Sequence, residues 1–159
     1  MKTIFLLCGP PASGKSSWAA KRAIPGHSAI ISRDRIRFEK LKDGEDYFAH
    51  EDEVLEEFYE QINAAIKAPW VDEVYIDATH LTKKARNATM EKICIPMLDS
   101  HVIAVAFDVP ADVCLIRNER RTGRAYVPPK AVQRMHKQFK IPTDKEVYPY
   151  NEIWRLVTL

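Results

Sequence analysis

The stretch that decides the fold is Gly9-Pro10-Pro11-Ala12-Ser13-Gly14-Lys15-Ser16, which matches the pattern G-x-x-x-x-G-K-[ST]. Its two glycines let the backbone turn sharply, so that a row of amide N–H groups can face phosphate oxygens. Lys15 supplies a positive charge for the β- and γ-phosphates of a nucleotide, and the Ser16 hydroxyl is a ligand for Mg²⁺. The pattern predicts a phosphate-binding loop at residues 9–16, with Ser17 adjoining it.

The segments on either side of this loop support the prediction. Lys2–Cys8 is a short apolar run typical of a buried strand, and Ser16–Arg22 has the character of a helix. The N-terminus of such a helix carries a partial positive charge that would point at the phosphates. A chance glycine-rich turn would not require this strand–loop–helix order, so we expect the loop to bind ATP.

Length and composition predict one soluble domain that spans residues 1–159. With 46% hydrophobic and 29% charged residues, the chain can bury a core without the help of disulfides or a structural metal ion. We find no apolar run near the ~20 residues of a membrane span and no signal peptide. Cys8, Cys94 and Cys114 are widely spaced, which favours reduced thiols and a cytoplasmic location over a disulfide framework or a zinc site.

The net charge of +2 conceals two segments of opposite sign. Acidic residues dominate from Glu39 to Glu60, where Lys40 and Lys42 are the basic exceptions. The basic residues gather between 115 and 140, with Glu119 as the acidic exception: Arg117, Arg120, Arg121, Arg124, Lys130, Arg134, Lys137 and Lys140. A basic face of this kind fits either a polyanion or the triphosphate of a nucleotide.

Short apolar runs alternate with helical periods along the whole chain. We expect strands at roughly 3–8, 28–32, 72–77, 101–107 and 152–158. We expect helices at roughly 14–22, 46–67, 83–98, 110–120 and 129–139. This alternation predicts an α/β fold: a central, mainly parallel five-stranded sheet with helices on both faces. Ligands of such sheets bind beyond the carboxyl ends of the strands, so the residues after each strand are candidates for chemistry.

The turn after the second expected strand contains Asp34, and Arg37 follows three residues later. A carboxylate here can accept the proton of an attacking hydroxyl, and an arginine on the same helix face can hold an acceptor phosphate. An N-cap role for Asp34 beside a solvated arginine face is the plainer interpretation of this segment taken alone. Both interpretations stay open on the segment alone.

The third expected strand ends in Ile76-Asp77, followed by Ala78-Thr79-His80. An aspartate at the tip of an apolar strand resembles the second acidic element of phosphate-loop proteins, which orders Mg²⁺ or positions the acceptor. The alternative is an aspartate that caps the next helix. Together with Ser16, Asp77 forms our predicted metal site, whereas His80 is interpreted as a loop histidine.

Residues 117–128 predict an arginine-rich lid. Arg117, Arg120, Arg121 and Arg124 surround a Thr-Gly break that ends at the pair Pro128-Pro129. Arginine suits bidentate phosphate contact, and a closing lid excludes water that would compete with the acceptor. A basic helix end that stabilises its own dipole is the plainer alternative.

Taken in order, these elements resemble the kinase domain of phage polynucleotide 5′-hydroxyl kinases, within the small phosphate-loop kinases. The resemblance covers nearly the whole chain, and it rests on the phosphate-binding loop and on segments 32–37, 76–81, 107–110 and 117–128. It implies that Asp34 is the general base toward the 5′-hydroxyl and that Arg37 contacts the acceptor phosphate. It also implies that Arg117 and Arg121 bind the donor phosphates and that ATP and Mg²⁺ are required.

The resemblance further implies transfer of the γ-phosphate to the 5′-hydroxyl of DNA or RNA, in nucleic acid repair and in a phage-infected cytoplasm. No Asp-x-Asp-Gly-Thr phosphatase motif is present, so we expect a free-standing kinase. Two departures stand out. The lid carries an additional residue near 122–124, which leaves open whether Arg120, Arg121 or Arg124 is the catalytic arginine. His80 replaces the asparagine that is common in relatives.

Two other functions compete with this one. A kinase for a nucleoside or another small metabolite shares the loop, sheet and lid, and would close over a compact acceptor pocket. A nucleotide-dependent switch or ATPase without an acceptor is the other alternative, although the chain lacks an Asn-Lys-x-Asp guanine signature. The sequence does not identify the residues that recognise the base, the preference between DNA and RNA, or the oligomeric state.

Overall fold

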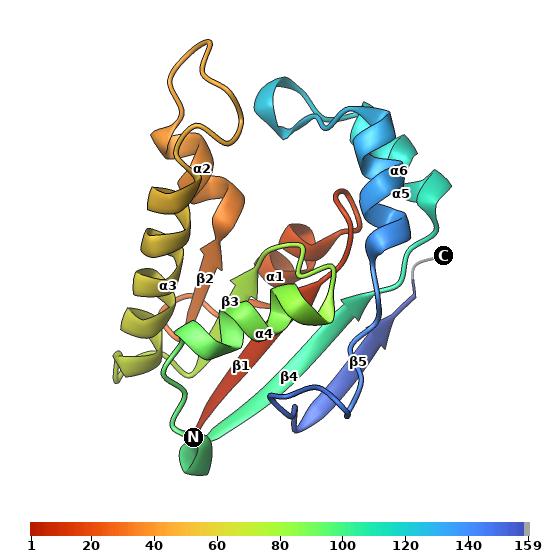
Figure 1. Ribbon diagram of the computed structural model, residues 1–159. Coiled ribbons are helices and arrows are strands. Elements are labelled where there is room, and N and C mark those ends of the chain that lie inside the picture. The colour runs from red at the N-terminus through yellow and green to blue at the C-terminus, as the bar shows by residue number, and fades with distance from the viewer. Residues whose placement is uncertain (158–159) are drawn as a thin grey trace.

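The computed structural model describes residues 1–157, in which strands and helices alternate along the chain (Figure 1). The strands are β1 (Lys2–Cys8), β2 (Ser28–Ser32), β3 (Glu73–Asp77), β4 (Ser100–Phe107) and β5 (Glu152–Leu156). The α-helices are α1 (Lys15–Arg22), α2 (Arg33–Lys40), α3 (Glu51–Lys67), α4 (Lys83–Lys92), α5 (Ala111–Glu119) and α6 (Pro129–Gln138). Short 3₁₀ turns add η1 (Met97–Asp99) and η2 (Gly123–Ala125).

The five strands form one sheet in the order β2-β3-β1-β4-β5, and every neighbouring pair is parallel. This confirms the predicted α/β class and the five-stranded sheet. The strand register aligns the carboxyl ends: Ser32 of β2 lies beside Asp77 of β3, which lies beside Leu7 of β1. Because Gly9 and Asp34 each follow within two residues of a strand end, the sheet delivers the predicted loop and both aspartates to one edge.

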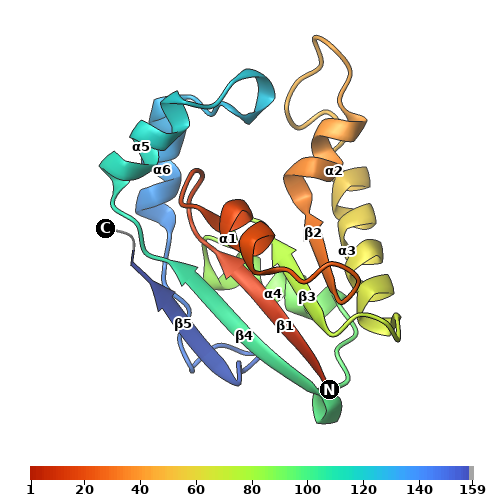
Figure 2. The same ribbon diagram turned by 180° about the vertical axis from the view of Figure 1, so that it is seen from behind.

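Helices cover both faces of the sheet, as predicted. The apolar side chains of α3 and α4 pack with alternate residues of β1 and β3 on one face, which Figure 1 shows in front. On the other face α1 packs on the remaining residues of β1 and on β4 (Figure 2). Both apolar layers take alternate residues from β1, whose segment Ile4–Cys8 is buried. A strand with two buried faces has a continuous apolar sequence, which is why this strand was predictable.

Two element boundaries and one additional helix differ from the sequence prediction. Residues 46–50 do not belong to α3, because the Asp46 side chain accepts the Phe48 N–H in a separate turn. Helix α4 ends at Lys92 rather than at 98, since the Cys94 N–H is bound by the Asn63 side chain and Pro96 disfavours helix before it. Helix α2 was not predicted as an element of its own. In the expected strand 152–158, residue 158 lies outside the described residues.

The lid at residues 117–128 projects above the carboxyl edge of the sheet and faces the loop between α2 and α3 (Figure 1). Within residues 1–157, no helix combines the length and apolar character that a membrane span requires. The polar edge between the lid and α2 is where the sheet places its candidate chemistry.

Candidate active site

The phosphate-binding loop has the backbone geometry that its sequence predicts. Ala12 and Gly14 adopt left-handed φ values of 62° and 98°, which curl the loop into the beginning of α1. A side chain at Gly9 would place its Cβ 2.8 Å from the Ser13 hydroxyl and 2.9 Å from the Phe107 Cβ. The first glycine of the motif is thus required by packing against β4.

Lys15 lies folded across this loop and is 8% exposed. Its Nζ donates to the carbonyl oxygens of Gly9 and Pro10, each at 2.9 Å. Burial lowers the pKa of Lys15, and the negative charges of Asp77 and Asp34 act in the opposite direction. The loop therefore holds the Lys15 ammonium group against its own backbone.

Asp77 and Ser16 meet across the carboxyl edge of the sheet. The Ser16 hydroxyl donates to Asp77 Oδ2 at 2.6 Å, although the two residues are far apart in the chain. Burial raises the pKa of the Asp77 carboxyl, opposed by the charge of Lys15 and by this hydrogen bond. The next helix is capped by Thr82, whose hydroxyl accepts the Ala85 N–H at 3.1 Å. Asp77 is therefore not the cap of α4.

The donor set of Ser16 and Asp77 fits Mg²⁺. Mg²⁺ prefers oxygen ligands and in nucleotide sites is held by one or two protein groups together with phosphates and water. Among the described residues, no cluster of three or more His, Cys, Asp or Glu side chains forms a self-sufficient metal cage. A hydroxyl and a carboxylate beside a phosphate-binding loop match the way in which this ion is usually shared with a nucleotide.

A cavity of about 820 Å³ opens from the phosphate-binding loop toward the lid. It is lined by Ala12, Ser13, Gly14, Ser17, Trp18, Lys21, Phe107, Arg117, Arg120, Arg121, Leu156 and Val157. Predicted cofactor residues from the loop and from the lid thus share one cavity. Its aromatic and aliphatic walls, from Trp18, Phe107 and Leu156, were not singled out from the sequence.

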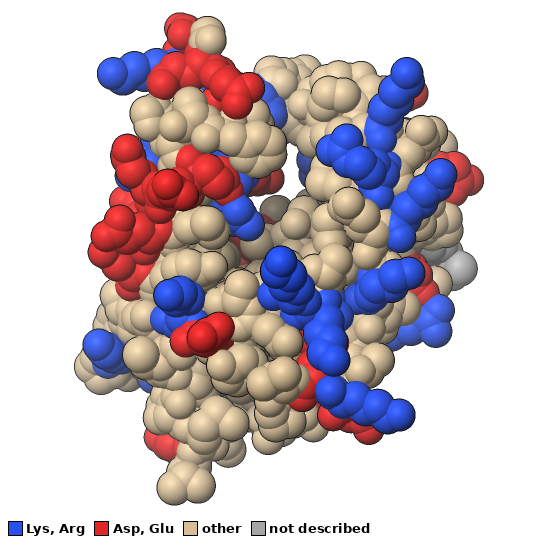
Figure 3. Space-filling view, in the orientation of Figure 1, with Lys and Arg blue, Asp and Glu red and all other residues tan. Residues whose placement is uncertain are grey.

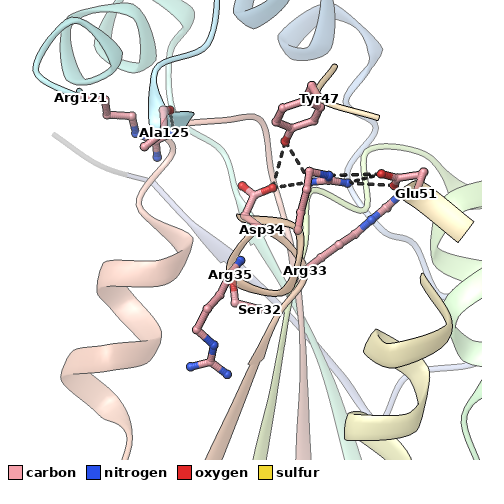
Figure 4. Close-up of polar contacts among 9 residues, drawn as sticks. Ser32, Arg33, Asp34, Arg35, Tyr47, Glu51, Arg121 and Ala125 are labelled. Atoms are coloured by element: carbon pink, nitrogen blue, oxygen red, sulfur yellow. Dashed lines mark hydrogen bonds and ion pairs between the residues drawn. The ribbon is translucent and has the colours of Figure 1, made fainter. Parts of the chain in front are cut away.

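Asp34 stands on the opposite side of the site, in the first turn of α2 (Figure 4). The Ser32 hydroxyl accepts the Arg35 N–H, so Ser32 and not Asp34 is the N-cap. Asp34 Oδ1 receives two hydrogen bonds, from Arg37 Nη1 at 2.5 Å and from the Tyr47 hydroxyl at 3.0 Å. With its side chain 60% exposed, Asp34 turns toward open space while one of its oxygens is fixed.

Arg37 is held by Glu51, the first residue of α3. Its Nη2 lies 2.8 Å from Glu51 Oε1 and its Nε lies 3.2 Å from Oε2, and Arg33 also pairs with this carboxylate. Burial acts to raise the pKa of Glu51, but the hydrogen bonds from Arg37 and Arg33 outweigh it and lower that pKa. Arg37 is 4% exposed, and its guanidinium stacks on the Tyr47 ring at 4.5 Å.

A second cavity, of about 510 Å³, lies over Asp34. Its walls are formed by Ser16, Ser32, Asp34, Arg35, Phe38, Glu39, Arg121 and Ala125. Arg121 lines both this cavity and the one at the phosphate-binding loop. Of the three candidate lid arginines, Arg121 is therefore the one shared by the two cavities, whereas Arg120 lines only the cavity at the phosphate-binding loop.

Arg124 has a different position and lines neither cavity. Its Nη1 donates to the carbonyl oxygens of Leu41 at 2.8 Å and of Phe38 at 3.3 Å, at the C-terminus of α2. Nη2 lies 3.4 Å from Asp43. Arginine suits this place, because the last carbonyl groups of a helix have no partner within the helix. The additional residue of the lid thus coincides with a bridge to α2.

The roles of Tyr47 and Glu51 and the burial of His80 were not predicted from the sequence. Glu51 begins an acidic helix, and its partner Arg37 was visible only as a neighbour of Asp34. His80 Nδ1 donates to the Leu7 carbonyl at 2.8 Å, and its Nε2 accepts the Thr89 hydroxyl at 3.0 Å. Burial lowers the pKa of His80 to about 4, so the ring is neutral at pH 7. It braces β1 rather than binding a ligand.

A phosphate-binding loop between a central strand and a helix, with a serine–aspartate pair beside it, defines a P-loop nucleotide-binding domain. Comparison with known sequences then gives the family. Residues 4–142 match the model of an AAA domain family, and the chain belongs to this family. No curated protein matches the sequence.

Solved structures with the same fold include several kinases. One chain of the Pnkp1/Rnl/Hen1 RNA repair complex superposes with a TM-score of 0.69 at 20% identity, over 86% of this chain and 43% of that one. A fungal RNA kinase has a TM-score of 0.61 at 13% identity, over 98% and 74% of the two chains. A sugar kinase from Janibacter sp. HTCC2649 has a TM-score of 0.60 at 17% identity, over 99% and 85%.

These similarities confirm the predicted P-loop kinase fold and the predicted resemblance to polynucleotide kinases at the level of the fold. The chain spans less than half of the Pnkp1/Rnl/Hen1 component that it matches. Since an RNA kinase and a sugar kinase have similar TM-scores, the comparison establishes the P-loop kinase fold, and both the activity and the acceptor have to be argued from the site.

Proposed function

We propose that this protein is an ATP-dependent polynucleotide 5′-hydroxyl kinase, which transfers the γ-phosphate to the 5′-hydroxyl end of DNA or RNA. The observation that carries the proposal is the meeting of two cavities at Arg121. The cavity of about 820 Å³ contains the phosphate-binding loop. The cavity of about 510 Å³, which we call the acceptor cavity, contains the Asp34 carboxylate, which is fixed by an arginine and a tyrosine. A donor site and an acceptor site that share a cation are what in-line phosphoryl transfer needs.

In the proposed reaction the acceptor hydroxyl oxygen attacks the γ-phosphorus while the bond to the β,γ-bridging oxygen breaks. Asp34 takes the hydroxyl proton on Oδ2, because its Oδ1 already accepts from Arg37 and Tyr47. Lys15 and the loop amides bind the β- and γ-phosphates, and Arg117 and Arg121 neutralise charge from the lid side. ADP and a 5′-phosphorylated end are the products.

Ser16 and Asp77 are the residues that would hold Mg²⁺ in this scheme. The ion supplies charge neutralisation at the β- and γ-phosphate oxygens. The chain's own contribution is the 2.6 Å contact that keeps the hydroxyl and the carboxylate together at the carboxyl edge of β1 and β3.

The acceptor role of Arg37 needs a refinement. Its guanidinium is buried and bound by Glu51, Asp34 and Tyr47. We propose that Arg37 chiefly orients Asp34, whose carboxylate lines the second cavity. Direct contact of Arg37 with the acceptor phosphate stays a prediction.

A small-molecule kinase is the second candidate. The second cavity, of about 510 Å³, lies within the range of small-ligand sites. A compact acceptor such as a nucleoside or a sugar would fit a cavity of this size, with the same roles for Asp34 and Lys15.

The deciding experiment measures transfer of labelled γ-phosphate from Mg·ATP to a 5′-hydroxyl oligonucleotide, a 5′-phosphorylated control and a panel of nucleosides and sugars. Label on the 5′-hydroxyl strand alone supports the proposal, label on a small molecule favours the second candidate, and hydrolysis without an acceptor points to an ATPase.

Lys15→Ala should abolish turnover with every acceptor. Asp34→Asn should retain ATP binding and slow transfer by about 10²-fold or more.

Asp52→Asn is the matched control for Asp34→Asn. Asp52 is also an aspartate in the first turn of a helix, α3, and it is exposed and away from both cavities. It should transfer phosphate at the wild-type rate. Equal rates for wild type and Asp34→Asn would reduce Asp34 to a surface carboxylate and remove the general base from the scheme.

A further inference from the structure

We propose that a basic track along α6 and the beginning of α4 binds the phosphate backbone of the acceptor strand beyond its 5′-terminal nucleotide. The track consists of Lys130, Arg134, Lys137, Lys140, Lys83 and Lys84. The inference rests on the proposed function and deepens it, since a track for successive phosphates has a use with a polynucleotide and none with a sugar or nucleoside.

The basic residues of α6 occupy one side of the helix. Lys130, Arg134 and Lys137 are spaced by four and three residues, which places them on one face, and all three are exposed. The opposite side holds the helix to the protein: Val132 is buried, and His136 Nε2 donates to the Val109 carbonyl at 2.8 Å. The helix is therefore fixed with its three cations toward solvent.

This arrangement of charge does not help the helices to fold. Like charges at these spacings repel by a few tenths of a kcal/mol per pair. Lys130 lies in the first turn of α6, and Lys83 and Lys84 begin α4, where the helix dipole favours acidic residues. Neither first turn contains an acidic residue. Cations at positively polarised helix ends make sense where an anion from outside is bound.

Among the described residues, none of the six track side chains forms an ion pair. Arg37 and Arg86 differ from the track residues, because both are paired with glutamates. The track is thus available to bind phosphates without breaking an ion pair within the protein.

Hydrogen bonds join the two parts of the track. Lys140, two residues after α6, donates its N–H to the Leu81 carbonyl at 2.8 Å. The Lys140 carbonyl in turn accepts from Arg86 Nη1 of α4 at 2.8 Å. The end of α6 therefore lies against the beginning of α4. Figure 3 shows Lys and Arg side chains spread over the right-hand half of this face, from the lid region downward.

The track also begins where the acceptor cavity ends. Arg121 and Ala125 line that cavity, and the lid leads directly into α6, where Lys130 lies in the first turn. The opposite wall belongs to α2, and α3, which packs against α2, carries acidic side chains of the kind visible on the left half of Figure 3. A polyanion that leaves the cavity is repelled by the acidic side and attracted by the basic side.

The dimensions suit a nucleic acid strand. Lys130 and Lys137 are separated by roughly 10 Å along the helix at 1.5 Å per residue. At about 3.4 Å per nucleotide of a helical strand, this distance corresponds to roughly three phosphates. The surface thus matches several consecutive phosphates rather than a single anion.

The test compares Lys130→Glu/Arg134→Glu with Lys67→Glu/Lys92→Glu, a control with the same change in net charge at exposed helical lysines outside the track. Acceptors are a nucleoside 3′-phosphate and 5′-hydroxyl oligonucleotides of increasing length. We expect wild-type kcat/KM to rise with length. The track variant should lose that gain, about tenfold or more on the longest acceptor, and should match wild type on the nucleoside 3′-phosphate. The control variant should follow wild type throughout.

Direct binding separates this inference from the proposed function. With a fluorescent oligonucleotide, the slope of log K against log salt should fall by about 0.7 for each phosphate that the track variant no longer binds. A reduced slope in the track variant, without kinase activity of the wild type on any nucleic acid, would retain the track and overturn the proposed function. An unchanged slope and unchanged kcat/KM on long acceptors, or an equal decrease on short and long ones, would overturn the track.

Discussion

Two arginine–glutamate pairs in this protein look alike and do different work. Arg86 pairs with Glu146 at 2.9 Å, and the two side chains are 1% and 2% exposed. Arg37 pairs with Glu51 at 2.8 Å, and these side chains are 5% and 22% exposed. Both arginines are bound through two nitrogens, the geometry that suits a guanidinium and a carboxylate. The difference lies in what else each arginine contacts.

The network around Arg86 is closed. Its Nη1 donates to the carbonyls of His80 and Lys140, while Glu146 also accepts the Thr143 N–H and the Tyr150 hydroxyl. These contacts tie α4 to the segment that leads into β5. Each partner is a fixed part of the protein, so this pair supports the fold.

The network around Arg37 is open on one side. It continues to Tyr47 and to Asp34, whose side chain is 60% exposed and lines the acceptor cavity. A buried pair whose last member faces a cavity can orient a reacting group without leaving a charge uncompensated. Pair geometry alone does not distinguish the two roles, whereas the exposure of the last group in the network does.

The largest expected effect is on the closed network. Arg86→Met removes one partner of a buried ion pair and leaves the Glu146 charge uncompensated. We expect a decrease of about 3 to 5 kcal/mol in the free energy of unfolding. Urea unfolding followed by circular dichroism measures this decrease, and the folded fraction should still transfer phosphate at the wild-type rate.

The double variant Arg86→Met/Glu146→Leu tests the cause of that decrease. Because the uncompensated charge accounts for most of it, removing both charges should recover much of the stability. A double variant as unstable as Arg86→Met would instead assign the effect to the hydrogen bonds of Arg86 with the His80 and Lys140 carbonyls.

The second prediction concerns His80, whose carbonyl belongs to the closed network. Its pKa is about 4 in the folded protein, compared with an ordinary 6.5. The unfolded chain therefore binds a proton more readily, and stability falls as the pH drops from 6.5 to about 4, by up to about 3 kcal/mol. Above pH 6.5 the whole contribution is present.

His80→Asn should remove this pH-dependent part. Asparagine tolerates the left-handed backbone of residue 80, where φ is 42°. The difference in unfolding free energy between wild type and variant should shrink as the pH falls from 7 to 4. A difference that stays constant over this range would mean that the ring does not titrate between the two states as described.

The sequence predicted the parts of the site that depend on local pattern. The loop at residues 9–16, the apolar strand before it and the aspartates at strand ends are fixed by nearby residues and by the parallel sheet. Tyr47 and Glu51 were not predicted, because their roles depend on how α2 packs against α3. From the sequence, the segment around them resembled the solvated face of one acidic helix.

The same limit applies to the arginines. The sequence identified a cluster at 117–124 without separating its members, because their side chains diverge only in space. Arg121 reaches the junction of the two cavities, whereas Arg124 crosses to the carbonyls of α2. Similarly, the buried role of His80 required β1 and α4 to be placed on either side of it.

The third prediction compares the two glutamates directly. Glu51→Gln keeps the shape of the side chain and removes the charge that holds Arg37. A hydrogen bond to a charged group contributes about 1.5 kcal/mol or more, so we expect phosphate transfer to slow on the order of tenfold. ATP binding should be unchanged, because Glu51 lines neither cavity.

Glu146→Gln is the matched variant in the closed network. It should lower the unfolding free energy more than Glu51→Gln does, and transfer per folded molecule should stay at the wild-type level. If the two variants were to lose transfer equally, the distinction between an open and a closed network would have no functional meaning.

The smallest expected effect comes from one hydroxyl in the open network. Tyr47→Phe removes the group that donates to Asp34 and accepts from Arg37, while the ring can still stack on the guanidinium. Loss of this hydrogen bond should reduce the stabilisation of the transition state by about 1 kcal/mol, because Asp34 is then less well oriented. We therefore expect kcat to fall roughly fivefold and the acceptor KM to stay unchanged. Tyr59→Phe, in α3 but away from both cavities, should have no effect. A rise in acceptor KM with unchanged kcat would place Tyr47 in acceptor binding, and the fixed orientation of Asp34 would then depend on Arg37 alone.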